Sequence, residues 1–340
     1  REAVARRVRT VLPGEAGGVA AALMTGLRGG IPEDSAEALR AAGLAHLLAI
    51  SGLHVGLVAG SLFFLLRAAL ALWPRVALCW PVKSVSAAIA WAGAGAYVLL
   101  AGATVPTLRA FIMVSLSLMA VMAGRRPISL RLVAVAALAV LAVRPEALVT
   151  AGFQMSFAAV VALVAAYEAL GPRLTAWRQG AGPVQRVALY FLAVILSTLV
   201  AEIAIAPFAA YQFHRIGFYG LAGNLIAVPV MSLWIMPWAL LALAFMPFGL
   251  DALALVPMSW GIDLVLATAK AVAAWPGAER GVPVFPALAL GLMALGALIG
   301  VIGGRRVCLV PALGLAVVGG LWAMTAGRPD LFFDRDGRLV

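Results

Sequence analysis

Two of the three histidines in the sequence, His46 and His54, lie on either side of a Ser51-Gly52 pair in an otherwise apolar stretch. An imidazole can carry a proton, ligate a metal or donate a hydrogen bond to an anion. A zinc site usually needs three or four protein ligands, but no third ligand lies nearby and His214 is the one remaining imidazole. The pattern therefore does not favour zinc. A structural role also remains open, in which Ser51 bonds a carbonyl and both histidines cap neighbouring helices.

Polar residues inside apolar segments are the informative ones, because an ionisable group at a bilayer centre costs at least about 2.5–3.5 kcal/mol unless it faces a partner or water. Glu202 lies sixteen residues after Arg186, which at a helical rise of about 1.5 Å puts it near the middle of a span. We expect it to be neutral or paired, with Arg109 or His54 as candidate partners. The remaining candidate site residues are Arg67, Gln154, Ser156, His214, Arg215 and Asn224.

The elements that position these residues must be membrane helices. Of 340 residues, 64% are hydrophobic and 11% charged, and the mean hydropathy is +1.05, whereas a globular protein is roughly 45–50% apolar and about 25% charged. This excludes a soluble enzyme, a disordered chain and a disulfide scaffold. It predicts an all-α fold, a polytopic transmembrane helical bundle. Cys79 and Cys308 form no CxxC pair and are expected to be inert packing thiols, and no metal or cofactor is expected.

About ten hydrophobic segments satisfy the length needed to cross a bilayer, some of them broken. Asn224 and Pro229 are expected to break the helix that contains them. We predict N-terminal surface or amphipathic helices over 1–46, a transmembrane domain over 47–326, and the start of a truncated extracytoplasmic domain over 327–340. The expected spans are Leu47–Trp73, Val85–Ala103, Thr107–Ala123, Leu130–Val143, Leu148–Leu170, Val187–Tyr211, Phe218–Phe245, Leu250–Ala274, Pro286–Ile302 and Val307–Ala326.

The formal net charge of +11 is open to two interpretations, nucleic-acid binding or the excess of basic residues in cytoplasmic loops. If the first span starts outside, most arginines between spans fall in inside loops, and Arg144, Arg215 and Arg280 fall outside. Both chain ends are then extracytoplasmic. The chain starts at Arg1 with no signal-peptide pattern, as expected of an internal segment of a longer protein.

His46-Leu-Leu-Ala-Ile-Ser-Gly-Leu-His-Val55 resembles the hallmark of the ComEC-type competence protein family, the inner-membrane DNA channel of natural transformation. Three further stretches agree in order: Val105–Met113 resembles a Pro…Arg-Ala…Met helix start, Gly152–Phe157 resembles Gly-Phe-Gln-Leu-Ser-Phe with Met155 in place of the usual Leu, and 201–229 resembles a Pro…Phe…Asn-Leu…Pro run. The resemblance covers about residues 15–325. It implies a multi-pass protein of the bacterial inner (plasma) membrane.

The resemblance also implies domains on both sides of the membrane region, an OB-like one before it and a metallo-β-lactamase-like one after it. Both are expected outside the cytoplasm, in agreement with the orientation derived from the arginines. The nuclease activity proposed for the second domain needs a His/Asp metal cluster, and this sequence has no His-x-His. We therefore do not expect this chain to be an enzyme.

On this resemblance, single-stranded DNA is the expected cargo, and a conduit for a polyanion with stackable bases needs basic groups, water and aromatic surface. Arg109 follows Pro106 by one helical turn and can face phosphate at a pore mouth or snorkel to the interface. Arg67 has the same two alternatives. Gln154 and Ser156 line the passage or bond between helices. Tyr211 to Arg215, with His214, form an entry vestibule or a solvated rim.

A passive pore cannot sustain uptake, because moving a negative charge into a negative interior costs about 2.3 kcal/mol per 100 mV. The sequence has no Walker A pattern, so we expect a cytosolic motor, strand capture or proton flux to drive transport. The partners implied by the family are a DNA receptor, uptake-pilus components and a cytosolic helicase or DNA-binding protein, besides the lipid bilayer; an oligomer is possible. The alternative function is a proton-coupled secondary transporter of a small anion or metabolite. A membrane scaffold for flanking domains is a third hypothesis.

Overall fold

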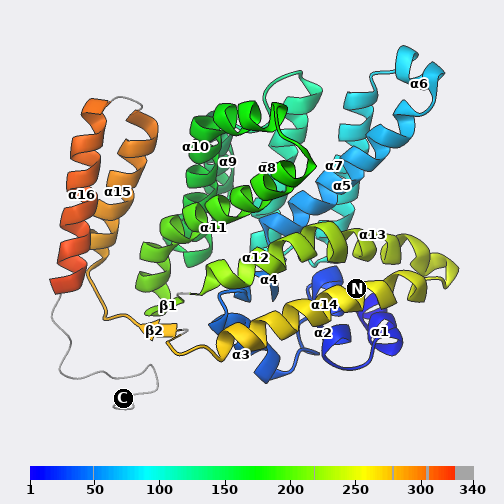
Figure 1. Ribbon diagram of the computed structural model, residues 1–340, viewed down its shortest axis with the longest axis horizontal. Coiled ribbons are helices and arrows are strands. Elements are labelled where there is room, and N and C mark those ends of the chain that lie inside the picture. Colours follow the sequence, from blue (N-terminus) through cyan, green and yellow to red (C-terminus); the bar gives the residue numbers. More distant parts are fainter. Residues whose placement is uncertain (49, 218, 278, 304–305, 326–340) are drawn as a thin grey trace.

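The computed structural model describes residues 1–48, 50–217, 219–277, 279–303 and 306–325. Helices dominate it, and the predicted all-α polytopic bundle is confirmed (Figure 1). The tail 327–340 lies outside the described residues. In chain order the elements are α1 (Glu2–Val11), α2 (Gly14–Thr25), α3 (Glu33–Ala41), α4 (Ala45–Leu48), α5 (Gly52–Ala71), α6 (Pro74–Cys79), α7 (Val82–Leu100), α8 (Val105–Met122), α9 (Leu130–Val143), η1 (Pro145–Val149), α10 (Ala151–Gln179), α11 (Pro183–Phe213), β1 (Arg215–Gly217), α12 (Gly220–Val230), η2 (Met231–Ile235), α13 (Met236–Phe245), η3 (Met246–Phe248), α14 (Ala252–Ala273), β2 (Glu279–Gly281), α15 (Ala287–Gly303) and α16 (Arg306–Thr325).

In the described part of the chain, eight helical segments are long and apolar enough to cross a membrane, and two shorter apolar helices, α9 and α15, accompany them. The eight are α5, α7, α8, α10, α11, the continuous run α12 to η3, α14 and α16. Together with the two shorter helices they correspond to the ten segments expected from hydropathy. The chain is therefore a multi-pass membrane protein.

Two helix boundaries depart from the hydropathy pattern for local reasons. The apolar run begins at Leu47, whereas α5 begins at Gly52. The residue before it, Ser51, is the N-cap and has extended backbone angles (φ −113°, ψ −179°), so the helix cannot include it. Near Pro229 the helix is distorted but not broken: the π-helical turn η2 follows it directly. A proline has no N–H to donate and crowds the preceding turn, and a π-turn is one way to absorb that loss.

The largest core joins the N-terminal helices to α5, α7, α13 and α14. Figure 1 shows α1, α2 and α3 beside α14, and nearly all of α2 from Gly17 to Thr25 is buried. Two ion pairs join the same elements: the Arg7 guanidinium donates to both carboxylate oxygens of Asp251 at 3.0 Å, and Lys270 Nζ lies 2.8 Å from Glu15 Oε2. The N-terminal helices are thus an integral part of the bundle.

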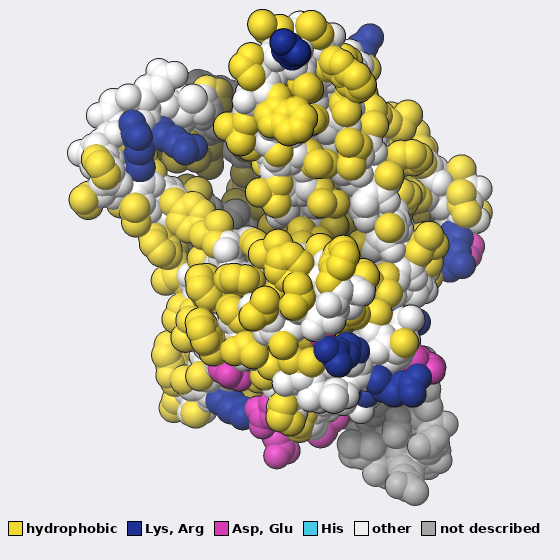
Figure 2. Space-filling model, turned by 90° about the vertical axis from the view of Figure 1, so that its right-hand side faces the viewer, with side chains coloured by type: hydrophobic (Ala, Val, Ile, Leu, Met, Phe, Trp, Pro, Cys, Tyr) yellow, Lys and Arg dark blue, Asp and Glu magenta, His cyan; other side chains and the backbone are white. Residues whose placement is uncertain are grey.

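Charge and hydrophobicity are distributed as a membrane requires. Figure 2 shows a face whose middle is covered by hydrophobic side chains, with Lys and Arg gathered toward its upper and lower ends and most of the visible Asp and Glu near the lower end. The two short strands β1 and β2 pair antiparallel, with Arg215 opposite Gly281. Away from the main core, α15 and α16 pack on each other as a hairpin and touch α11 through a small cluster around Phe285.

Candidate functional site

The Ser51–His54 stretch forms the start of α5 as a capping box. The backbone N–H of Ser51 donates to His54 Nδ1 at 3.2 Å, and the Ser51 hydroxyl lies 3.2 Å from the same atom. Because Nδ1 accepts, the neutral ring carries its hydrogen on Nε2. That atom is buried with no hydrogen-bond partner among the described residues. A donor without an acceptor therefore lies at the start of α5.

The other histidine of the stretch is oriented differently. His46 lies on α4, is exposed, and its Nδ1 lies 3.2 Å from the Gly43 carbonyl oxygen. A carbonyl only accepts, so Nδ1 of His46 carries the hydrogen and the other nitrogen of the neutral ring is an acceptor. Within the described ranges, no group of three His, Cys, Asp or Glu side chains is arranged to hold a metal ion.

The start of α5 packs against α8, where a Cβ on Gly52 would lie 3.9 Å from Ala110. The preceding residue, Arg109, is only 7% exposed. Its Nη2 donates to the carbonyl of Gly152 on α10 at 3.0 Å, and its Nε is buried without a partner in the described structure. Since a guanidinium has several donors and stays charged in proteins, one carbonyl leaves this group incompletely satisfied.

A side-chain amide pair joins α10 to α11. Gln212 Nε2 donates to Gln154 Oε1 at 3.1 Å, and both side chains are partly buried. Ser156, also partly buried, lies two residues further along α10. Interhelical hydrogen bonding, one of the two roles considered for Gln154 from sequence, is therefore present.

Glu202 and three glycines connect α11, α12 and the turn before α4. A Cβ on Gly220 would lie 2.2 Å from Glu202 Oε1, and a Cβ on Gly43 would lie 2.8 Å from the Gly220 Cα. One turn along α12, a Cβ on Gly223 would lie 3.1 Å from the Ala42 carbonyl oxygen. Glu202 therefore lies at the N-terminus of α12. Among the ion pairs of the described residues, none joins Glu202 to Arg109 or His54.

These contacts form a closed circuit from α5 to α8, α10, α11, α12, the 42–44 turn and back through α4 to α5, which we call the polar ring. Four of the seven buried polar side-chain atoms that lack a partner in the described residues lie on it or at its α11 end: His54 Nε2, Arg109 Nε, Asn224 Oδ1 and His214 Nδ1. Buried polar atoms in folded proteins are nearly always bonded to protein or water. The polar ring therefore carries buried polar groups whose hydrogen-bonding capacity can be met by water or a polar ligand.

Three of the sequence candidates lie away from the centre of the polar ring. Arg67 is exposed near the C-terminal end of α5. His214 ends α11 in the left-handed conformation with φ 54°, and Arg215 is exposed on β1. In sequence, Tyr219 follows β1 and Trp275 precedes β2, and the centroids of these two rings are 5.1 Å apart.

The sequence interpretation missed the glycines that close the polar ring. Gly43, Gly152 and Gly220 each lie against a neighbouring backbone or a charged side chain, where any Cβ would intrude. These glycines could have been identified by their position next to the polar motifs, because glycine in a membrane helix often allows two backbones to approach closely. Gln212 also belongs to the site. A side-chain amide within an apolar helix is the sequence feature that indicates such a residue.

Comparison with known proteins gives a family match and a similar protein. A sequence profile described as "Competence protein" matches residues 23–307. The chain is similar to ComE operon protein 3 of Bacillus subtilis (strain 168), with 26% identity over 230 residues, which cover 68% of this chain and 26% of that protein. The chain thus spans about a quarter of the length of that relative. No solved structure matches significantly.

Proposed function

The chain belongs to the competence protein family, and on that premise we propose that it forms a transmembrane passage through which single-stranded DNA is taken up in natural transformation. The observation that carries the proposal is the polar ring, a closed circuit of helix contacts on which several elements carry buried polar atoms without a partner among the described residues. Family membership favours DNA over a small anion or metabolite as the cargo.

The polar ring has the chemistry that a polyanion needs. Arg109 is a buried cation held by one carbonyl, so most of its donors are available to phosphate oxygens. His54 offers a neutral Nε2–H whose orientation is fixed by its capping-box bond to Ser51. A neutral donor assists passage without holding the strand, whereas a row of cations would trap it.

Glu202 fits the same proposal although it is an acid. Its carboxylate lies against the first residue of α12, and a helix N-terminus stabilises negative charge. We infer that this contact offsets the charge of Glu202 and limits repulsion of the strand. Gln154 on α10 and Gln212 on α11 then supply neutral amides to the polar ring.

We further propose that the protein lies in the bacterial inner membrane with both described ends outside. The arginine-bearing 73–83 and 124–129 segments would then face the cytoplasm, as the distribution of basic residues favours. The DNA receptor, uptake-pilus components and cytosolic helicase implied by the family would act on either side, and the drive would come from one of them or from proton flux.

The test is DNA uptake by cells carrying the full-length gene with Arg109→Gln. We expect transformation to fall by about tenfold or more, the factor that 1.4 kcal/mol of lost interaction represents, with membrane levels unchanged. Arg75→Gln is the matched control, because it also removes one arginine, from an exposed position on α6. Equal transformation by the two variants would overturn the assignment of Arg109.

A further inference from the structure

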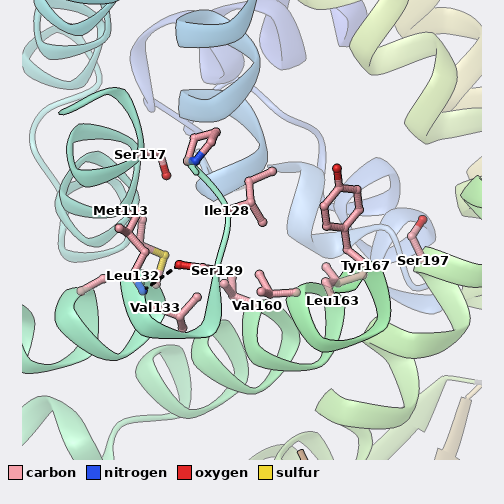
Figure 3. Close-up of a pocket in the computed structure, with 13 residues that line it drawn as sticks. Met113, Ser117, Ile128, Ser129, Leu132, Val133, Val160, Leu163, Tyr167 and Ser197 are labelled. Carbon is pink, nitrogen blue, oxygen red and sulfur yellow. Dashed lines mark hydrogen bonds between the residues drawn. The ribbon is translucent and has the colours of Figure 1, made fainter. Parts of the chain in front are cut away.

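A cavity with a volume of about 440 Å³ lies between α8, α9, α10 and α11. It is separate from the polar ring. Figure 3 shows its lining, in which Met113, Leu132, Val133, Val160 and Leu163 converge from three helices. The lining is almost entirely apolar, and the few polar groups are hydroxyls: Ser117, Ser129, Tyr167 and Ser197. We call this cavity the apolar groove.

Neither water nor nucleic acid suits the apolar groove. Apolar cavities of this kind stay dry in proteins, and an unfilled void forfeits the dispersion contacts of its lining atoms. None of the polar-ring residues lines it. Because α8, α10 and α11 are long and apolar enough to cross a membrane and α9 is a shorter apolar helix beside them, the apolar material available to fill it is the acyl chain of a lipid.

One end of the apolar groove is basic. Its lining includes Pro127 to Ser129, which directly follow Arg125 and Arg126, and Arg131 lies in the first turn of α9; all three arginines are exposed. At this end the carboxylate of Glu168 accepts a hydrogen bond from the Leu130 backbone N–H at 3.4 Å. Three guanidinium groups against one engaged carboxylate suit an anionic headgroup, and basic pockets between membrane helices bind such headgroups.

The lining hydroxyls agree with an interface at this same end. Ser129 is the N-cap of α9 and accepts from the Leu132 backbone N–H at 3.3 Å, so it marks the end of the helix. Tyr167 is 62% exposed, and tyrosine side chains are enriched where a membrane meets water. The deep part of the apolar groove is therefore hydrocarbon-like and its mouth is interfacial.

We propose that the apolar groove is a specific site for an anionic phospholipid, with one acyl chain between α8, α9 and α10 and the phosphate at Arg125, Arg126 and Arg131. A lipid there completes the packing between α8–α9 and the α10–α11 pair. The site is independent of the DNA path, since it shares no residue with the polar ring.

The test is native mass spectrometry of the purified protein incubated with equal amounts of phosphatidylglycerol and phosphatidylcholine bearing identical acyl chains. We expect the wild type to retain about tenfold more phosphatidylglycerol, because juxtamembrane arginines attract anionic headgroups. Leu163→Trp narrows the groove and should reduce retention. Leu138→Trp is the matched control, because Leu138 is 68% exposed on α9 and does not line the groove.

A second variant keeps the proposal falsifiable if Leu163→Trp misfolds. The surface pair Arg125→Gln with Arg126→Gln should equalise the two lipids, whereas Arg75→Gln with Lys83→Gln, which removes the same charge from exposed positions, should leave the preference intact. Equal retention of both lipids by the wild type, or a folded Leu163→Trp that binds as the wild type does, would overturn the site. So would displacement of the bound lipid by a short single strand of DNA.

Discussion

Gly43 and Gly220 meet backbone to backbone: a Cβ on Gly43 would lie 2.8 Å from the Gly220 Cα. The contact joins the turn before α4 to the first residue of α12, two segments far apart in sequence, and it closes the polar ring. Gly43 also has φ +71°, a conformation that side chains rarely adopt. Two separate physical reasons therefore require glycine here.

Gly43→Ala should destabilise the protein by more than the cost of placing alanine in the left-handed backbone conformation. The left-handed conformation costs a non-glycine residue roughly 1–2 kcal/mol, and the clash with backbone adds to that. Gly14→Ala is the control, because Gly14 has φ +80° but nothing within 4 Å of a new Cβ. Thermal unfolding in detergent measures both. Equal losses for the two variants would contradict the close contact.

Substitutions at His54 should separate helix capping from DNA handling. Gln at this position retains an acceptor for the Ser51 backbone N–H, as in an ordinary capping box, so His54→Gln should unfold near the wild-type temperature. His54→Ala should lose stability. Both should lower DNA uptake, because Ala has no donor and the flexible Gln amide does not hold its N–H where the imidazole ring fixes Nε2–H. Full uptake by His54→Gln would show that the fixed position of this donor is dispensable.

Ser51→Ala tests the other half of the capping box. Loss of an N-cap hydroxyl lowers the free energy of unfolding by about 0.5–2 kcal/mol. The start of α5 is also part of the polar ring. We expect a lower unfolding temperature, measured in detergent, and reduced uptake. Ser51→Thr, which keeps a capping hydroxyl, should restore most of the stability, and failure to do so would argue against capping as the role of Ser51.

The Arg7–Asp251 pair predicts a pH dependence of stability. The hydrogen bonds from Arg7 hold the pKa of the buried Asp251 carboxyl below its usual range. A carboxyl whose pKa is depressed in the folded state stabilises the protein when the pH is above its pKa in the unfolded state, which is about 3.9. That stabilisation is lost as the pH falls through the pKa of the folded state. Wild-type unfolding temperature should therefore fall more steeply below about pH 4 than that of Asp251→Asn.

Glu33→Gln is the control for this measurement. Glu33 pairs with Arg40, but both side chains are exposed, at 78% and 52%, and such surface pairs contribute little. Its pH profile should follow that of the wild type. Parallel profiles of Asp251→Asn and the wild type would instead show that the buried pair carries no pH-dependent stability.

Two leucines on α14 provide a matched test of packing. Leu255 is 0% exposed and Leu253 is 65% exposed. Leu255→Ala should cost about 2–5 kcal/mol, the usual range for a buried leucine, and Leu253→Ala far less, because its side chain faces outward. Chemical unfolding in mixed micelles compares them. Similar losses would mean that α14 does not pack as described.

The same two leucines show where sequence reasoning reaches its limit. In a soluble helix the apolar stripe identifies the buried face, but in a membrane both faces are apolar, since lipid and protein interior favour the same side chains. Hydropathy therefore located the spans, although it placed the start of α5 at Leu47 and not at Gly52. It could not distinguish Leu255 from Leu253, nor predict that α2 is buried.

The sequence could predict which residues belong to the candidate site, but not which residues each of them contacts. His54 and Ser51 form their pair within one turn, so the motif itself contains the geometry. Arg109 was one of two candidate partners for Glu202, but no ion pair of the described residues joins them, and Arg109 donates to the Gly152 carbonyl. That contact depends on how α8 and α10 meet, which glycine placement determines and periodicity does not reveal.

The burial of α2 against α14 also has a consequence for biosynthesis. Arg7 and Asp251 are 244 positions apart, so at the usual 5–20 residues per second the ribosome needs about 12–50 s to produce the partner of α1. During that interval, α1 and α2 have been synthesised but the helix on which they pack has not. A translational pause or a truncation before α14 would therefore expose the N-terminal helices to quality-control proteases, although those helices are complete from the beginning.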